Sequence, residues 1–548
     1  VDYNGGISFD VPNMLMDFQN EYGRGALGQY GATAGGSWGA KGKTYPDNVR
    51  DFYNTGISVN NYVGITGGTQ KLKGYASYTN NSVSGIVPKN RMDRNTLNVR
   101  VTAQVLPKLT TDVKVTYVNR KIHNLPRLGD QGINNEAYIM PRDLSSDSLK
   151  AYEGFDATGK PYPLYWTNSS TFQNPYWDVY RNSVNEERNR VMLMSSAKYQ
   201  FTNWLSLQGR YSLDRYDDKI TSSYYDGTVA FPVQPGGRYL EAYVNHWERN
   251  MDLLLSGNNK ISPAVSINYN VGASLLDISG YNTQDLANGL SIPNQFNLNF
   301  ATTPSYSSIS VKKEVQSVYG NAELDLKEFL YLDISARQDW SSTLPAPYGY
   351  FYPSVGLSAI LSDMFKMPSW ISLAKVRASY TQVGNDADPY LLQQTYTYNQ
   401  GAGNGFVSRN DTKAIDNLKP EQTKSYEAGL DWRFLDGRIG IDATIYKSST
   451  INQLILIGLP QASGFNNEYI NAGNIQNKGV EIVLSATPVA GKSFGWDTKV
   501  NFAANRNKVI SLKAGVSSVS LSAGNNYFGN LLITPGGSYG DIYDYVWA

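Results

Sequence analysis

Long stretches in which apolar and polar residues alternate strictly recur along the whole chain. In residues 438–446 (RIGIDATIY), every second residue from Ile439 to Ile445 is apolar, and the alternate residues from Gly440 to Tyr446, Asp442 included, are polar, aromatic or glycine. A period of two places the two kinds of side chain on opposite faces of a β-strand. One face of each strand therefore has to meet an apolar environment, which is either a protein core or lipid.

The alternation predicts seventeen strands, most of them 10 to 15 residues long. Strands of ordinary globular proteins average about 5–6 residues, whereas a strand that crosses a membrane needs about 9–11. The predicted strands cover residues 1–11, 57–66, 69–80, 94–107, 109–121, 188–202, 204–217, 241–257, 264–276, 313–327, 329–341, 350–362, 370–382, 421–433, 437–450, 477–488 and 495–505.

Short and long connections alternate between these strands. Short ones, such as those at Lys108, Asn203 and Glu328, alternate with long ones. The long connections are predicted at 12–56, 122–187, 277–312, 383–420, 451–476 and 506–548, with 81–93 and 342–349 as shorter members. Short turns at one end and long loops at the other are typical of an outer-membrane barrel. The sequence therefore predicts an all-β fold, a large antiparallel transmembrane β-barrel with long extracellular loops.

In a barrel of this kind the apolar face of each strand contacts lipid and the polar face lines the lumen. The polar faces include charged side chains, which we predict to face the lumen; these are Arg100, Lys114, Arg337 and Asp442. The alternative is a large soluble β-protein in which the same apolar faces pack on a core.

Composition excludes several classes of protein. The 548 residues contain 48 Lys and Arg against 47 Asp and Glu, so no net field attracts nucleic acid. Cysteine is absent and there are two histidines, so we predict no metal site and no cofactor. No nucleophile, zinc-protease or phosphate-binding motif is present, which predicts that the protein is not an enzyme.

The acids of "DRYDD" (214–218) are predicted to lie at a solvated strand end, with Ca²⁺ binding as the minor alternative.

The beginning of the chain has neither an initiator Met nor a signal peptide. Bacterial single-chain barrels have even strand numbers. Seventeen is odd, so we expect residues 1–548 to be a partial barrel, with closing strands after Ala548.

Eight segments, in order along the chain, resemble the SusC/RagA family of TonB-dependent outer-membrane transporters of Bacteroidetes. They are "DFQNEYGRGALGQY" with "SWGAKG", "NPYWDVYRNSVNEERNRVM", "TNWLSLQGRYSLD", "LYLDISARQDWSSTLP", "YFYPSVGLSAIL", "KVRASYTQVGNDADPY", "LKPEQTKSYEAGLDWRF" and "INAGNIQNKGVEIVLSATPV". Each alone is moderately specific, whereas their shared order is highly specific.

The resemblance implies a 22-stranded barrel, of which about 17 strands are present here, with an N-terminal plug and a TonB-contacting segment outside this sequence. It implies TonB-dependent import of large nutrients, glycan oligomers or peptides, across the outer membrane by a multi-pass protein. It also implies a SusD-like surface lipoprotein as partner. A passive porin and a soluble secreted adhesin remain the alternatives from other classes.

Loop 122–187 carries the aromatic residues that best suit a substrate. Tyr162, Tyr165 and Trp166 lie close together in sequence, and aromatic faces beside amides suit sugars or peptides. We predict them as substrate contacts, with packing inside the loop as the alternative. "NPYW" (174–177) is predicted to place its aromatics at the membrane interface, just before a strand.

Overall fold

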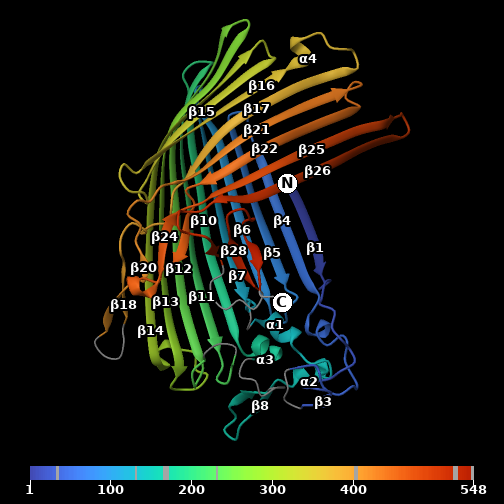
Figure 1. Cartoon of the computed structure of the whole chain (residues 1–548), viewed down its shortest axis with the longest axis vertical. Coiled ribbons are helices and arrows are strands. Elements are labelled where there is room, and N and C mark those ends of the chain that lie inside the picture. Colours follow the sequence, from blue (N-terminus) through green and yellow to red (C-terminus); the bar gives the residue numbers. More distant parts are fainter. Residues whose placement is uncertain are drawn as a thin grey trace. The chain divides into compact units, whose positions relative to one another are not determined.

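The computed structural model describes residues 1–31, 36–129, 132–164, 172–229, 233–399, 405–521 and 529–544. Within them, seventeen strands form one antiparallel sheet, and all seventeen predicted strands are confirmed (Figure 1). The strands of the sheet are β1 (Asp2–Asp10), β4 (Gly56–Gly68), β5 (Leu72–Ser84), β6 (Arg91–Leu106), β7 (Leu109–His123), β10 (Ser183–Gln200), β11 (Leu205–Tyr224), β12 (Arg238–Ser262), β13 (Val265–Leu290), β14 (Ala301–Leu326), β15 (Leu330–Ser341), β16 (Gly349–Ile360), β17 (Ile371–Asn385), β21 (Glu421–Phe434), β22 (Ile439–Ile451), β25 (Asn474–Ala490) and β26 (Gly495–Ser511).

Smaller elements occupy the connections. The helices are η1 (Arg50–Phe52), α1 (Ile133–Tyr138), α2 (Ser146–Lys150), α3 (Pro175–Tyr180), η2 (Leu298–Phe300), α4 (Leu361–Met364) and η3 (Gln461–Ser463). The short strands are β2 (Gly25–Ala26), β3 (Gln29–Tyr30), β8 (Glu153–Phe155), β9 (Pro161–Pro163), β18 (Tyr396–Asn399), β19 (Phe406–Arg409), β20 (Thr412–Lys413), β23 (Leu454–Gly458), β24 (Asn467–Asn471), β27 (Val519–Ser520), β28 (Asn530–Ile533) and β29 (Asp541–Tyr543). Across the described ranges, no helix is both long and apolar enough to span a bilayer.

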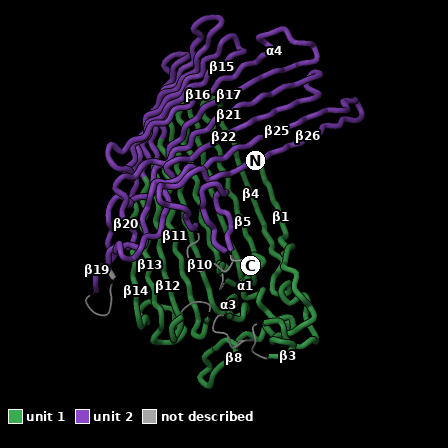
Figure 2. The backbone as a smooth tube through the Cα atoms, in the orientation of Figure 1, with its two compact units in different colours: residues 1–196, 211–249, 278–311 green, residues 197–210, 250–277, 312–548 purple. Residues whose placement is uncertain are grey.

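The chain divides into two compact units, coloured separately in Figure 2. Unit 1 contains residues 1–196, 211–249 and 278–311, and unit 2 contains residues 197–210, 250–277 and 312–548. The long strands in the middle of the sequence contribute to both units.

Strand pairing follows chain order and keeps like faces together. In unit 1, β6 pairs with β7 so that Val99 lies opposite Val115, while Arg100 lies opposite Lys114. In unit 2, β14 pairs with β15 from Val315 opposite Ser341 to Leu326 opposite Leu330. Because direct cross-strand partners point to the same face, the period-two pattern of each strand adds up to one apolar and one polar face.

The apolar face of the sheet is exposed and uncovered. Ile445 on β22 is 61% exposed, and other large apolar residues on the sheet are also exposed, including Val99, Val101, Ile334 and Leu357. The three buried hydrophobic clusters among the described residues lie instead in the connections and the strand ends that adjoin them. A soluble β-protein would bury such residues in a core on the sheet. Their exposure favours lipid as the environment of this face.

One predicted connection is wrong. Residues 277–312 are mostly strand, since β13 continues to Leu290 and β14 begins at Ala301. A strand of 26 residues extends for roughly 85 Å at about 3.3 Å per residue, far beyond an apolar band of about 25 Å. Outside that band neither face has to be apolar. The backbone ladder therefore continues through residues whose composition resembles a loop.

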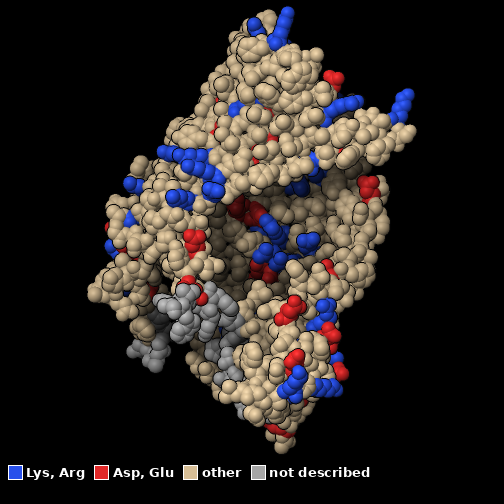
Figure 3. All heavy atoms as spheres, turned by 45° about the vertical axis from the view of Figure 1, so that its right-hand side comes forward, with Lys and Arg blue, Asp and Glu red and all other residues tan. Residues whose placement is uncertain are grey.

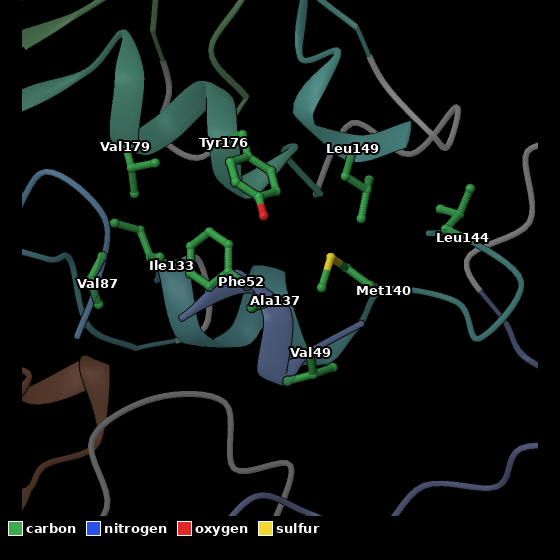
Figure 4. Close-up of a cluster of buried hydrophobic side chains, with 10 residues drawn as sticks. All are labelled: Val49, Phe52, Val87, Ile133, Ala137, Met140, Leu144, Leu149, Tyr176 and Val179. Atoms are coloured by element: carbon green, nitrogen blue, oxygen red, sulfur yellow. The ribbon is translucent and has the colours of Figure 1, made fainter. Parts of the chain in front are cut away.

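The largest buried cluster joins three connections of unit 1. Phe52 of η1 meets the ring of Tyr176 of α3 edge-on, with the ring centroids 5.3 Å apart. Figure 4 shows the ten buried side chains of this cluster, which we call the loop core: Val49, Phe52, Val87, Ile133, Ala137, Met140, Leu144, Leu149, Tyr176 and Val179. The three connections that contribute these residues therefore pack into a folded layer of their own.

Candidate functional site

The polar face of the sheet in unit 2 carries a connected set of charged and phenolic side chains. Arg210 on β11 donates two hydrogen bonds to Asp252 on β12, at 2.9 and 2.8 Å. The hydroxyl of Tyr319 on β14 also donates a hydrogen bond to Asp252, at 2.7 Å from the Oδ2 atom that accepts from Arg210 Nη2. Three strands are thus tied together by side chains, in addition to their backbone ladder.

The same network continues to β15 and β16. The Arg337 guanidinium lies 5.2 Å from the centre of the Tyr319 ring, and its Nε donates to Asp339 Oδ1 at 2.7 Å. Tyr352 donates to the second Asp339 oxygen at 2.5 Å. Asp339 is buried, and charge-assisted hydrogen bonds of this kind satisfy a carboxylate away from water. Arg337 is therefore held in place on this face.

A glycine allows Tyr319 to reach Asp252, because β13 lies between their two strands. A Cβ atom added to Gly272 on β13 would lie 2.5 Å from Tyr319 Cζ. Because glycine has no Cβ atom, the ring of Tyr319 can lie across β13, and its hydroxyl reaches Asp252 on β12.

Arg377 on β17 makes a second bridge of this type. Its Nη2 donates to Asp442 Oδ1 at 2.7 Å and to Thr444 Oγ1 at 2.6 Å, both on β22. Gly429 on β21 lies beneath it, and a Cβ atom there would be 2.7 Å from Arg377 Nε. Glycine thus again lets a long side chain span the strand between.

Two open cavities flank these bridges within unit 2. One, of about 340 Å³, is lined by Tyr319, Arg337, Tyr352 and Thr381 among others. The second, of about 270 Å³, is lined by Asp333, Lys375, Arg377 and Glu427 among others. The first presents hydroxyl, amide and guanidinium groups, and the second adds the carboxylates of Asp333 and Glu427, so each can exchange hydrogen bonds with a polar solute.

Unit 1 carries ion pairs of the same kind. Arg100 donates two hydrogen bonds to Asp112, at 2.9 and 2.8 Å, and Thr102 donates to the same carboxylate at 2.8 Å. Lys114 is exposed beside them, as the register partner of Arg100. Figure 3 shows that charged side chains are sparse over much of the surface in view, and that basic and acidic ones lie close together in several places, with one group of basic ones alone at the upper left.

The expectation for "DRYDD" is wrong in its position. Asp214 and Asp218 lie within β11, which runs on to Tyr224, and they pair with Arg190 and Arg188. Asp218 receives both of its hydrogen bonds from Arg188 at 2.6 Å. A carboxylate engaged in this way is not free for Ca²⁺. Over the described part of the chain, no cluster of metal-ligating side chains is found.

The structure places the four predicted lumen residues on polar strand faces and shows partners that the sequence did not indicate. Arg100 pairs with Asp112, Arg337 with Asp339, and Asp442 with Arg377. Sequence reasoning missed Asp252, Tyr319 and Arg377 as members of the networks. The signal that could have found them is a glycine on the polar face of an intervening strand, but using it requires the cross-strand register.

The predicted substrate aromatics are only partly described. Tyr162 lies on β9 and is 46% exposed, so it does not pack into the loop core. Tyr165 and Trp166 lie outside the described residues.

The prediction for "NPYW" is wrong: Asn174 caps α3 by accepting a hydrogen bond from the Tyr176 amide at 3.0 Å. Tyr176 and Trp177 are buried within the loops, because the cap starts a helix where a strand lead-in was expected.

A buried charge cluster lies next to the loop core. Arg127 is 3.3 Å from Glu136 on α1 and also 3.3 Å from Asp178 on α3. Burial raises the pKa of Glu136 well above its ordinary range, and the nearby Asp178 raises it further. Burial also raises the pKa of Asp178, against the opposing effect of Arg127. Two carboxyl groups share one guanidinium here, so protonation of one of them is favoured.

Comparison with known proteins identifies relatives of the chain. The family model described as "TonB dependent receptor-like, beta-barrel" matches residues 129–547. The TonB-dependent receptor SusC of Bacteroides thetaiotaomicron is 25% identical over 566 residues, which cover 94% of this chain and 53% of SusC. TonB-dependent receptor P26 of Formosa agariphila is 24% identical, over 87% of this chain and 48% of that protein. The chain thus spans about half the length of the curated relatives it matches.

Solved structures share the fold. The RagAB peptide importer in its closed-closed state matches with a TM-score of 0.74 and 18% identity, over 89% of this chain and 54% of that chain. The ferripyoverdine receptor of Pseudomonas aeruginosa matches with a TM-score of 0.52 and 14% identity, over 82% of this chain and 54% of that chain. At these identities the likeness concerns the barrel fold alone.

Proposed function

Because the chain belongs to the TonB dependent receptor-like β-barrel family, we propose that it is the barrel part of a protein that imports large nutrients across the outer membrane. Its apolar strand faces contact lipid, its polar faces line the path, and the long loops face the cell exterior. The chain crosses the membrane many times, and the proposal contains no enzymatic step.

One observation carries this proposal: the sheet exposes large apolar side chains on one face and networks of charged side chains on the other. A lipid-facing band outside and a polar interior are what a transmembrane barrel requires. Arg100, Lys114, Arg337 and Asp442 are then lumen residues. Three of them are held by partners, so they form a fixed polar wall.

The proposed cargo is a glycan oligomer or a peptide. The cavities beside Arg337 and Arg377 offer both donors and acceptors, which suits the hydroxyl groups of sugars and the amides of peptides alike. The description of one relative of known structure as a peptide importer supports the peptide class. We propose Tyr162, Tyr165 and Trp166 as contacts for cargo at the outer loops.

We further propose that a surface lipoprotein covers the loops and that TonB supplies the energy through an N-terminal segment. The loop core supports the first part, because loops packed on their own hydrophobic core present a preformed surface to a partner. In this proposal residues 1–548 are a partial barrel, and the plug and the closing strands belong to the remainder of the protein.

Uptake by intact cells tests the proposal. Cells that carry the full-length natural protein are given labelled oligosaccharides or labelled peptides, with and without collapse of the inner-membrane proton gradient. We expect accumulation of one cargo class, its loss in a deletion strain, and its loss when the gradient collapses. Accumulation that is independent of the gradient would favour a passive porin and contradict TonB-dependent import.

Co-purification tests the partner. The natural protein is extracted from membranes in mild detergent, and the peptides of the purified complex are mapped by mass spectrometry. A lipoprotein that remains bound, together with peptides of a plug preceding Val1, is the expected result. A protein that is released without detergent and purifies alone would instead indicate a soluble β-rich adhesin.

A further inference from the structure

The exposed face of unit 2 contains a pocket that the transport proposal does not use. Its volume is about 660 Å³, within the range of about 300–1,000 Å³ that is common for small-molecule sites. The lining residues are Glu314, Gln316, Trp340, Ser341, Ser342 and Tyr348. They come from the middle of β14, the end of β15 and the connection that follows β15.

This pocket lies on the apolar, outward face of the sheet. Along β14, Lys312, Glu314, Gln316 and Val318 are exposed, whereas Val315 and Ser317 between them are buried. Gln316 is the register partner of Trp340, so both point to the exposed face. The networks of Arg337 and Tyr319 belong to the opposite face, and the pocket is therefore separate from the proposed path.

The level of the pocket on the sheet is set by the sequence of β14. Every second residue from Val318 to Leu326 is apolar or glycine, which makes a stripe nine residues long. About 9–11 residues are enough to cross a membrane. The stripe ends at Gln316 and Glu314, so the pocket begins where the hydrocarbon ends. It lies beyond the apolar stripe, at the end of β15 and on the side opposite the short β14–β15 turn, which is the outer side of a barrel.

The chemistry of the pocket suits a sugar ring. Trp340 is 40% exposed, and its indole packs closely against Gly349, where an added Cβ atom would be 3.0 Å from Trp340 Cδ1. The Gln316 amide donates to Glu314 Oε1 at 2.8 Å, which orients the carboxylate beside the aromatic face. An aromatic face stacks on the apolar C–H face of a sugar, while a carboxylate and an amide take its hydroxyl groups. The negative charge disfavours phosphate.

Tyr348 gives an independent indication. Its φ angle is +67°, a conformation that bulky residues rarely adopt and that glycine would adopt without strain. Its ring is nonetheless 52% exposed and lines the pocket. A strained backbone that presents an aromatic side chain to solvent is a pattern found at ligand sites.

We propose that this pocket binds a sugar ring in the headgroup of a glycolipid of the outer leaflet, with the acyl chains lying along the apolar stripe of β14. The same chemistry would accept a sugar ring of a soluble glycan. The position at the end of the stripe favours the lipid-linked form, because its acyl chains then replace other lipid on a face that is already apolar.

The test uses the full-length natural protein in detergent, freed of co-purified lipid. Native mass spectrometry measures binding of glycolipid isolated from the source outer membrane, and of the same glycan after its acyl chains are removed. The variants are Trp340→Ala, Glu314→Gln and Tyr348→Gly. The last one removes the ring while relieving the backbone strain, so its loss of binding is not a loss of folding. Trp370→Ala is the control, since Trp370 is an exposed tryptophan at the opposite end of the strands.

We expect the glycolipid to bind, and Trp340→Ala and Tyr348→Gly to weaken it by about tenfold. The control should bind like the natural protein, and the free glycan should bind more weakly. Equal binding of the free glycan, lost in Trp340→Ala, would retain the sugar site and overturn the lipid as its source. Unchanged glycolipid binding in both aromatic variants would overturn the site itself. None of these results depends on transport, so failure here leaves the import proposal standing.

Discussion

At the scale of single residues, glycines decide which polar side chains can meet across the sheet. Gly272 and Gly429 each lie in a strand between two residues that bond to one another over it. Tyr446 repeats the arrangement, since it lies over Gly479 and donates to Asn505 at 3.2 Å. The usual cost of glycine in a strand is offset here by contacts that no larger residue would permit.

Gly429→Ala tests this role. The new Cβ atom would lie 2.7 Å from Arg377 Nε and 2.9 Å from the carbonyl oxygen of Ala443, so Arg377 has to leave Asp442. We expect a loss of about 1–3 kcal/mol in the free energy of unfolding, measured by denaturant titration in lipid vesicles. Gly209→Ala is the matched control: this strand glycine faces open space, and the change there should cost less than about 0.5 kcal/mol. Equal costs at the two sites would refute the bridging role.

The facing of β22 is a second property of single residues. Ile441 lies in the middle of the apolar face of this strand, and Asp442 on the other face is bound by Arg377. Ile441→Arg should cost about 2–4 kcal/mol if the residue faces the middle of the bilayer. Asp442→Asn keeps a hydrogen-bond acceptor for Arg377 and should cost less than about 1 kcal/mol. Unfolding titrations of the two variants in vesicles compare them, and similar costs would contradict the assigned facing.

At the scale of elements, strands and connections obey different rules. The strands extend beyond any membrane because backbone pairing continues without an apolar face, as β13 and β14 show. The connections of unit 1 pack on each other through the loop core, so they behave as a folded layer. This layer also holds the buried cluster of Arg127, Glu136 and Asp178.

The stability of this layer should depend on pH. The folded pKa of Glu136 is raised above its ordinary value of 4.5, so the folded state binds a proton that the unfolded state releases. The stabilisation is therefore fully present below about pH 4.5 and is lost as the pH rises through the raised pKa. Hydrogen exchange of the α1 and α3 amides should accelerate over that range beyond the intrinsic effect of pH.

Glu136→Gln should remove much of this pH dependence, because the amide cannot ionise. Asp156→Asn is the control in the same loop. Hydrogen bonds from Thr158 lower the pKa of Asp156 below 3.8, so its contribution is lost only as the pH falls below that value. A Glu136→Gln protein whose exchange keeps the natural pH dependence would show that the cluster does not titrate as described.

At the scale of the whole molecule, the described strands of the sheet leave their apolar side chains exposed and do not pack them on a core, which fits a face in contact with lipid. The buried clusters of the described residues are confined to the connections and neighbouring strand ends. The family match agrees with this physical conclusion, since its members are outer-membrane barrels. Folding and membrane insertion of such a sheet are therefore coupled.

Membrane fractionation checks this coupling. The full-length protein in isolated outer membranes should resist extraction by alkaline carbonate and be released only by detergent, since removal from lipid would expose the apolar faces to water. An immunoblot of the two fractions provides the measurement. Release into the carbonate supernatant would contradict the transmembrane assignment and favour a soluble β-protein.

The sequence by itself determined the seventeen strands, their order and the facing of their side chains, because a period of two is a local property that each strand displays alone. It also determined that Arg100, Lys114, Arg337 and Asp442 lie on polar faces. The motifs further identified the family, since their order along the chain survives low overall identity.

Only the tertiary structure decided which residues meet. The pairing of Arg337 with Asp339 and Tyr352, and the reach of Tyr319 over Gly272, depend on the register between strands. Register is set jointly by all the strands and is not written in any one of them. The lengths of β13 and β14 and the helix at Pro175–Tyr180 escaped the sequence for the opposite reason: their residues are polar or aromatic, and both loops and ordered elements use them outside the hydrocarbon.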